Sequence, residues 1–214
     1  MKTKLLFVKR RFLIVLLFAL MFACLIAGAT TSVAYAAGEH TSHSGWNTLS
    51  GTLSNERDFW MPAGNYVLTD DLIFSKSYTC TFDRTDGDTV LCLNGHKLVN
   101  GSTDLAPPII SNEDRNLTIC DCTGKGSVNS LKTYGVSFSN VSLYSNYVCD
   151  QKNTVTTIDG NTKIYSGIVE ASYDGDMIIG GNTYIETGVE LAVRNIGHLI
   201  INGGTVRCDI NVTG

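Results

Sequence analysis

A repeat with a period of 21–22 residues fills the C-terminal part of the chain, and it limits the possible folds more than any single motif. Its copies are TTIDGNTKIYSGIVEAS, MIIGGNTYIETGVELAV and LIINGGTVRCDINVTG, between residues 156 and 214. Four sets of residues recur at this period: Ile158, Ile179 and Ile201; Gly160, Gly181 and Gly203; Thr162, Thr183 and Thr205; Ile168, Val189 and Ile210. Segments this short bury an apolar face only by stacking on the next copy, so the repeat predicts a solenoid.

Each copy reads as a short strand, a Gly/Asn turn and a second short strand, rich in β-branched residues and without helical periodicity. This pattern favours an all-β fold, a right-handed parallel β-helix. A leucine-rich repeat has a similar length, but its Leu-x-x-Leu-x-Leu pattern is absent. We expect the recurring glycines to turn with positive φ, and Asn161 and Asn182 to bond from coil to coil.

Three regions follow from the pattern along the chain. Residues 1–36 combine a basic start, an apolar run and the small-residue motif AYA, which is typical of a secretory signal peptide. A retained membrane anchor is the alternative, because the run approaches the ~20 residues that span a bilayer. Residues 37–70 are predicted to be an N-terminal cap, with a short helix or turn leading into a first strand. Residues 71–214 are predicted to be the β-helix, which stops in mid-repeat, so we expect a truncated C-terminus or a missing C-terminal segment.

The charge balance limits the partners. The predicted leader carries five of the 16 Lys and Arg and none of the 20 Asp and Glu, so the remaining chain has a net charge of −9. Nucleic-acid binding requires a basic surface and is therefore not expected. After leader removal the sequence predicts a secreted or cell-surface protein without a membrane segment.

The segments GNYVLTDDLIF, TVLCLNGHKL and LTICDCTGKGSV resemble the N-terminal portion of large exported β-helix surface proteins of Gram-positive gut anaerobes, within the pectin-lyase-like superfamily. The resemblance covers about residues 45–214. It implies an adhesin-like or carbohydrate-associated protein whose partner is an extracellular glycan or the surface of a host or neighbouring cell. The superfamily also implies the alternative function, a polysaccharide lyase or glycoside hydrolase acting on uronate-type polymers.

Stacking the copies in register tests for catalysis. Hydrolases of this superfamily need two or three carboxylates close together, and lyases need calcium-binding carboxylates beside a basic residue. No column of the stack collects carboxylates, since Glu170 is expected opposite Leu191. We therefore predict no catalytic residue.

Ligand binding is the favoured hypothesis for the same columns. The register is expected to place Lys163, Tyr184 and Val206 in one column, and Tyr165 and Glu186 in the next but one. Tyrosine rings stack on sugars, so Lys163, Tyr184, Tyr165 and Glu186 are the predicted ligand-binding residues. The alternative interpretation is that the tyrosines only cover the outer surface of the coil.

Asp174 and Asp176 are candidate calcium ligands, because an Asp-x-Asp turn can offer two carboxylates to a hard cation. Calcium is the only cofactor that the sequence suggests. The competing interpretation is that these aspartates form a turn, for which Asp-Gly is common.

Six cysteines follow the predicted leader, and Cys120 and Cys122 are separated by one residue. Cysteine metal sites normally use a C-x₂-C pair. We expect Cys92 and Cys120 to occupy equivalent places in neighbouring coils, ~4.8 Å apart, which is within reach of a disulfide. Three interpretations stay open: packed free thiols, which we favour, a Cys92–Cys120 disulfide, and a metal site.

Overall fold

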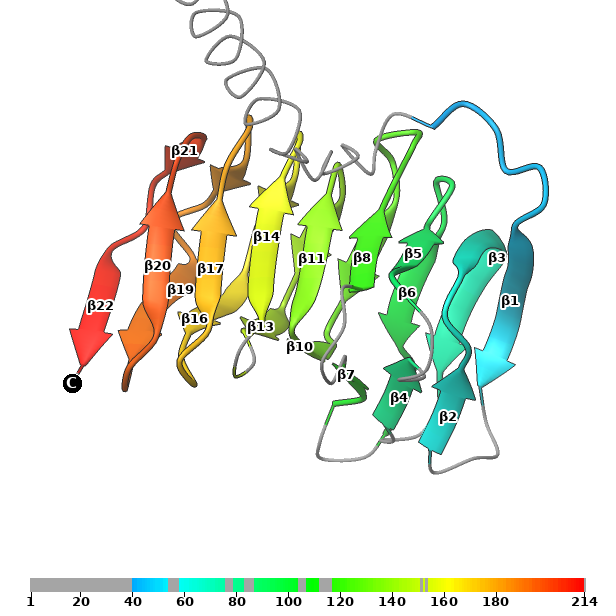
Figure 1. The fold of residues 1–214 in the computed structure, drawn as a ribbon, viewed down its shortest axis with the longest axis horizontal. Coiled ribbons are helices and arrows are strands. Elements are labelled where there is room, and N and C mark those ends of the chain that lie inside the picture. The colour runs from blue at the N-terminus through cyan, green and yellow to red at the C-terminus, as the bar shows by residue number, and fades with distance from the viewer. Residues whose placement is uncertain are drawn as a thin grey trace, which may run out of the picture. The chain divides into compact units, whose positions relative to one another are not determined.

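The computed structural model describes residues 40–53, 58–75, 79–82, 87–103, 107–111, 117–150, 152 and 154–213. Strands and turns make up these ranges, and each strand pairs in parallel with the equivalent strand of the next coil. This part of the chain is therefore an all-β parallel β-solenoid, which confirms the predicted fold class (Figure 1). The hand of its coils stays a prediction. No helix in the described residues is long and apolar enough to cross a membrane.

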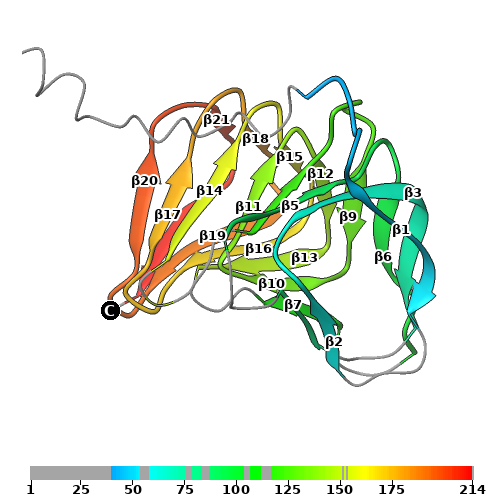
Figure 2. The same cartoon turned by 45° about the vertical axis from the view of Figure 1, so that its right-hand side comes forward.

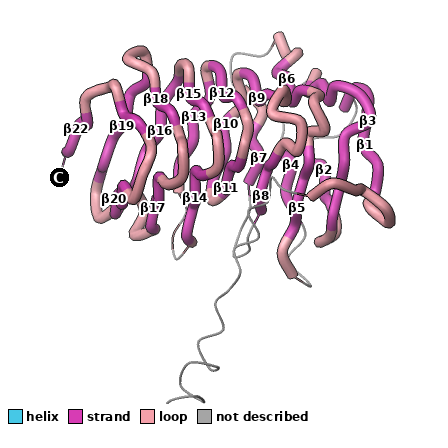
Figure 3. Tube along the Cα trace, turned by 90° about the horizontal axis from the view of Figure 1, so that it is seen from above, coloured by secondary structure: helices cyan, strands magenta, loops and turns pink. Residues whose placement is uncertain are grey.

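Six successive coils each contribute one strand to each of three faces, and two earlier strands extend the third face (Figures 2 and 3). The first face holds β5 (Thr89–Cys92), β8 (Leu117–Cys120), β11 (Val136–Ser139), β14 (Val155–Asp159), β17 (Asp176–Ile179) and β20 (His198–Ile201). The second face holds β6 (Lys97–Asn100), β9 (Ser127–Asn129), β12 (Ser142–Tyr144), β15 (Lys163–Ile164), β18 (Tyr184–Ile185) and β21 (Thr205–Val206). The third face holds β2 (Asp58–Met61), β4 (Thr79–Phe82), β7 (Ile109–Ser111), β10 (Lys132–Tyr134), β13 (Asn146–Cys149), β16 (Gly167–Ala171), β19 (Val189–Arg194) and β22 (Ile210–Thr213).

Two further strands lie beside the first of these coils. Strand β3 (Asn65–Phe74) bends across a corner, pairing with β5 through its first half and with β6 through its second. Strand β1 (Asn47–Leu53) runs parallel to β3 along both halves. The sequence predicted a short helix or turn leading into a first strand. A turn closes at Trp46, but Leu49 and Leu53 lie in a strand, which corrects the helix alternative. These residues form a strand because their backbone pairs with the free edge of β3, while the Leu49 side chain packs against the core.

Columns of apolar side chains fill the interior. On the first face, paired residues form one column: Leu91, Ile119, Phe138, Ile158 and Ile179. Each of these side chains is at most 2% exposed. Full burial of such a side chain contributes about 1.5–3 kcal/mol, so these columns are the main source of stability.

The predicted register is right in the first half of the repeat and wrong in the second. Ile158, Ile179 and Ile201 pair as expected. On the third face, however, Ile168 pairs with Glu190, not with Val189. Two residues separate β15 from β16, whereas three separate β18 from β19, and this extra residue moves the pairing by one position.

The same shift affects other predicted alignments on the third face. Glu170 pairs with Ala192, where the sequence placed Leu191 opposite it. Leu191 in turn pairs with Ile210, which the sequence had aligned with Val189.

A second shift occurs in the last coil, where the turn between β20 and β21 is one residue shorter than the turn between β17 and β18. Tyr184 consequently pairs with Thr205 and not with Val206, as the sequence had predicted. Gly204, in place of the expected Gly203, has the positive φ of 84°.

Candidate functional site

A groove of about 540 Å³ follows the corner between the first and second faces. Four successive coils contribute to it, and nearly all of its lining groups are polar side chains or glycine backbone. The lining residues are Asp121, Cys122, Thr123, Gly124, Ser139, Asn140, Ser142, Gly160, Asn161, Lys163, Gly181 and Asn182. We call this feature the corner groove.

A ladder of asparagines runs along the corner groove. The Asn161 side-chain amide donates to Asn140 Oδ1 at 3.3 Å, and that of Asn182 donates to Asn161 Oδ1 at 3.3 Å. The Asn161 backbone N–H also donates to Asn140 Oδ1, at 2.8 Å. The predicted stacking of Asn161 on Asn182 is thus confirmed, and Asn140 extends the ladder by one coil.

Glycine is required beside this ladder. Gly160 and Gly181 have φ of 67° and 55°, a region that residues with a side chain rarely adopt. A Cβ atom at Gly160 would lie 2.5 Å from Asn140 Oδ1, and one at Gly181 would collide with the Asp159 carboxylate. The groove floor is therefore bare backbone, which brings peptide groups within reach of a ligand.

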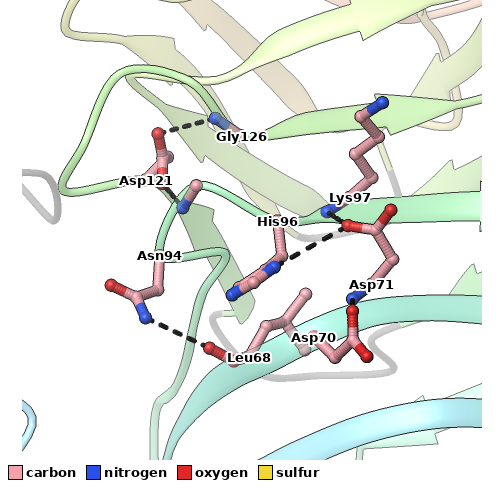
Figure 4. Close-up of polar contacts among 9 residues, drawn as sticks. Leu68, Asp70, Asp71, Asn94, His96, Lys97, Asp121 and Gly126 are labelled. Atoms are coloured by element: carbon pink, nitrogen blue, oxygen red, sulfur yellow. Dashed lines mark hydrogen bonds and ion pairs between the residues drawn. The ribbon is translucent and has the colours of Figure 1, made fainter.

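Asp121 closes the N-terminal end of the groove and is 1% exposed. Its carboxylate accepts hydrogen bonds from the backbone N–H groups of Gly95, Lys125 and Gly126 at 2.7, 2.6 and 2.8 Å and from the Thr123 hydroxyl at 2.9 Å. Figure 4 shows the bond to Gly126. Burial alone raises the pKa of Asp121, but these hydrogen bonds outweigh it and lower the pKa below the ordinary value. Asp121 therefore fixes the turn as a buried anion.

Lys163 is the one predicted ligand-binding residue that lines the corner groove. It is exposed, and its backbone pairs with Ser142 on one side and Tyr184 on the other. A lysine at this position places a positive charge beside the amides and hydroxyls.

The other three predicted ligand-binding residues do not line the corner groove. The Tyr184 hydroxyl donates to Glu186 Oε1 at 3.2 Å and accepts from the Arg207 guanidinium at 2.9 Å. Tyr165 stacks on Tyr144, with ring centroids 4.7 Å apart and planes 3° apart. These residues form a polar and aromatic strip on the second face, and the role of Arg207 in it was not anticipated from the sequence.

Cys92 and Cys120 are paired residues of β5 and β8, which confirms their predicted stacking. Both are buried free thiols, in a small cluster with Val67 that Trp46 partly covers. The Cys120 thiol, as a hydrogen-bond donor, lowers the pKa of Cys92. Cys92 Sγ also lies 3.6 Å from the sulfur of Cys122. The Cys92–Cys120 disulfide stays one of the interpretations that the sequence leaves open.

Of the candidate calcium ligands, Asp174 lies in the exposed turn before β17, and Asp176 is the first residue of that strand. Asp176 Oδ1 is 3.0 Å from His198 Nδ1, and Asp174 has φ of 59°. Neither residue belongs to a group of three or more potential metal ligands among the residues that the structure describes. Calcium binding here stays a prediction.

Sequence reasoning missed a second acidic group, at the bend of β3. Ligand atoms of Asp70, Asp71 and His96 all lie within 4.8 Å of one another. Asp71 Oδ1 accepts the backbone N–H of Lys97 at 2.8 Å and is 3.8 Å from His96 Nδ1, as Figure 4 shows. The side chains are partly exposed. Their contacts with one another and with the Lys97 backbone account for their positions without a bound metal ion.

The chain matches no family model, no curated protein and no solved structure.

Proposed function

We propose that this protein is an exported, non-catalytic binding module, at the cell surface or secreted, that recognises an extracellular carbohydrate in the corner groove. The single observation that carries this proposal is the groove lining itself. Amide and hydroxyl side chains and bare glycine backbone repeat along it from coil to coil. Such groups both donate and accept hydrogen bonds, as sugar hydroxyls do.

The spacing supports an extended, repetitive ligand. Neighbouring parallel strands lie about 4.8 Å apart, so equivalent donors and acceptors recur at that interval along the groove. Each contact with a ligand in an open groove is weak, but several repeated contacts made together give useful affinity. A polymer with regularly placed hydroxyl groups meets this requirement better than a small compact molecule does.

The charges in the groove favour binding over hydrolysis. Hydrolases need two carboxylates flanking the bond to be cleaved. Asp121 is the only carboxylate among the lining residues, and its oxygens already accept four hydrogen bonds. Lys163 adds one positive charge, which suits a neutral or uronate-containing glycan.

Glycan-array screening followed by calorimetry tests the proposal. We expect an oligosaccharide to bind without turnover, and Asn161→Ala and Lys163→Gln each to weaken binding about tenfold, because each removes hydrogen bonds worth ~1 kcal/mol or slightly more. Lys152→Gln is the matched control, since Lys152 is exposed but lies outside the groove. Circular dichroism checks that the variants fold.

Two outcomes contradict the proposal. One is binding that both groove variants leave unchanged. The other is release of shortened products from a uronate polymer, which would favour the lyase or hydrolase alternative.

A further inference from the structure

We propose that His40, His43, Cys92 and Cys122 form a binding site for a zinc-like transition-metal ion. One ligand atom from each residue lies within 4.8 Å of all the others. The site is independent of the glycan proposal, although Cys122 also borders the corner groove.

The distances match a tetrahedral ion. The two sulfurs are 3.6 Å apart, Cys122 Sγ is 3.8 Å from His43 Nε2, and the Nε2 atoms of His40 and His43 are 2.9 Å apart. Tetrahedral zinc with bonds of about 2.3 Å to sulfur and about 2.0 Å to nitrogen separates its ligand atoms by about 3.8, 3.5 and 3.3 Å respectively. These three separations are within a few tenths of an ångström of the tetrahedral values, and the remaining three are at most 4.8 Å, so small side-chain movements bring the four atoms into a coordination shell.

The segment before β1 supplies both histidines. The Trp46 backbone N–H donates to His43 O at 3.1 Å and closes a turn. The Trp46 ring lies 4.6 Å from the His40 ring and 5.0 Å from the His43 ring, measured between centroids. These contacts orient the two imidazoles toward the same point. In Figure 1 this segment, drawn in blue, passes the upper ends of β5 and β8.

Two adjacent coils supply the cysteines. Cys92 ends β5, and its paired residue Cys120 ends β8. Cys122 follows two residues later, in the turn that Asp121 holds. Its sulfur is also 3.9 Å from Asn94 Oδ1, and the Asn94 amide donates to Leu68 O at 3.3 Å (Figure 4). The turns are thus fixed by contacts outside the cluster, as in metal sites whose ligands are oriented by neighbouring groups.

The ligand types select the ion and its role. Two thiolates and two imidazoles suit zinc and other borderline or soft ions, and are unsuited to calcium. Four protein ligands fill a tetrahedral shell, so the ion would be structural. Binding would release the two thiol protons to solvent and hold residues 40–46 against the turns after β5 and β8.

Metal titration tests the proposal. The full chain is expressed with its own N-terminal segment, and whatever product the host makes from it is purified under metal-free, reducing conditions. We expect one Zn²⁺ per chain by calorimetry and a higher melting temperature with the metal bound. Co²⁺ should give visible ligand-field absorption and thiolate-to-cobalt charge-transfer absorption.

Matched variants locate the ion. His43→Asn and Cys122→Ser should each weaken Zn²⁺ binding by more than ~100-fold, since loss of even an outer partner of a ligand costs about 10–100-fold. His198→Asn and Cys208→Ser should bind as the unaltered chain does. His40→Asn, at a half-buried position before β1, provides a ligand variant that leaves the coils intact if Cys122→Ser fails to fold.

The proposal is overturned if no Zn²⁺ binds, or if the ligand variants bind as well as the controls do. Mass spectrometry of the alkylated, unreduced chain adds another test. A disulfide from Cys92 to either Cys120 or Cys122 in the exported protein would remove the thiolates and contradict the site.

Discussion

Asp121 and Asp150 each follow a buried cysteine at the end of a strand, and the two aspartates are 1% and 0% exposed, yet the protein holds them in different ways. Asp121 accepts four hydrogen bonds from the turn around it. Asp150 accepts the Ser172 backbone N–H at 2.8 Å, but its second oxygen has no hydrogen-bond partner within the described part of the chain. The two carboxylates are thus equally buried, but only that of Asp121 has hydrogen-bond partners for both of its oxygens.

The pKa values of the two carboxyl groups are consequently shifted in opposite directions. Burial raises the pKa of Asp150 to about 6, with a smaller contribution from the nearby Glu170 carboxylate. At Asp121 the backbone donors reverse the effect of burial and lower the pKa. The comparison teaches that a buried aspartate organises a turn only where enough donors converge on it. The Asp121 corner presents Cys122 and borders the groove, whereas the Asp150 corner has neither feature.

Replacing each aspartate by asparagine should show the largest difference between the corners. In Asp121→Asn, the amide N–H₂ faces at least one backbone N–H, which can only donate, in either orientation of the amide, so we expect a loss of about 3–5 kcal/mol in the free energy of unfolding. In Asp150→Asn the change removes a poorly solvated carboxylate, so we expect no loss of stability at pH 7 and a gain of up to about 3 kcal/mol. Urea unfolding measures both, and equal losses would contradict the comparison.

The pH dependence of stability should differ in sign. Because the folded pKa of Asp150 is raised, the folded state binds more protons than the unfolded state, and stability falls as the pH rises from about 4 to about 6, by up to about 3 kcal/mol. The pKa of Asp121 is lowered, so its contribution is present above pH 4 and is lost as the pH falls through the folded pKa.

Unfolding free energies of the unaltered chain and the two asparagine variants, measured from pH 3 to 8, separate these contributions. Asp150→Asn should abolish the decline between pH 4 and 6. If the decline persists in that variant, Asp150 is not its source.

Two glycines of the Asp121 corner sharpen the comparison at a smaller scale. A Cβ at Gly126 would lie 2.7 Å from Leu93 Cβ and 2.9 Å from Asp121 Cγ, so Gly126→Ala should cost about 1–3 kcal/mol through overpacking. Gly124 has φ of 70° and open space around it, so Gly124→Ala should cost only about 1 kcal/mol, from backbone strain. Thermal unfolding ranks the two, and a reversed order would show that the Asp121 turn tolerates displacement.

The sequence predicts the parts of this molecule that depend on a constant period. Ile158, Ile179 and Ile201 pair as expected because the turns between their coils keep nearly the same length. The third-face register could not be predicted, since the loop before β19 gains one residue that carries no distinctive signal. The groove was anticipated only at Lys163 and the asparagine ladder.

The metal-ligand cluster was beyond reach for a different reason. Cys92 and Cys122 are 30 residues apart, and they meet because one coil intervenes and the chain turns at Asp121. A search for closely spaced cysteine pairs does not detect such an arrangement. The spacing of His40 and His43 was a usable signal, but it acquires meaning only once the segment before β1 is placed beside those turns.

The central claim is that the Asp121 corner, unlike the Asp150 corner, is built to present a metal-ligating cysteine. Anomalous diffraction at the zinc edge, from crystals of the full chain grown with Zn²⁺, tests this claim most directly. The account predicts one strong peak bounded by His40, His43, Cys92 and Cys122, and none beside Cys149 and Asp150. An absent peak at the first position, or continuous density between Cys92 Sγ and another sulfur, would contradict it.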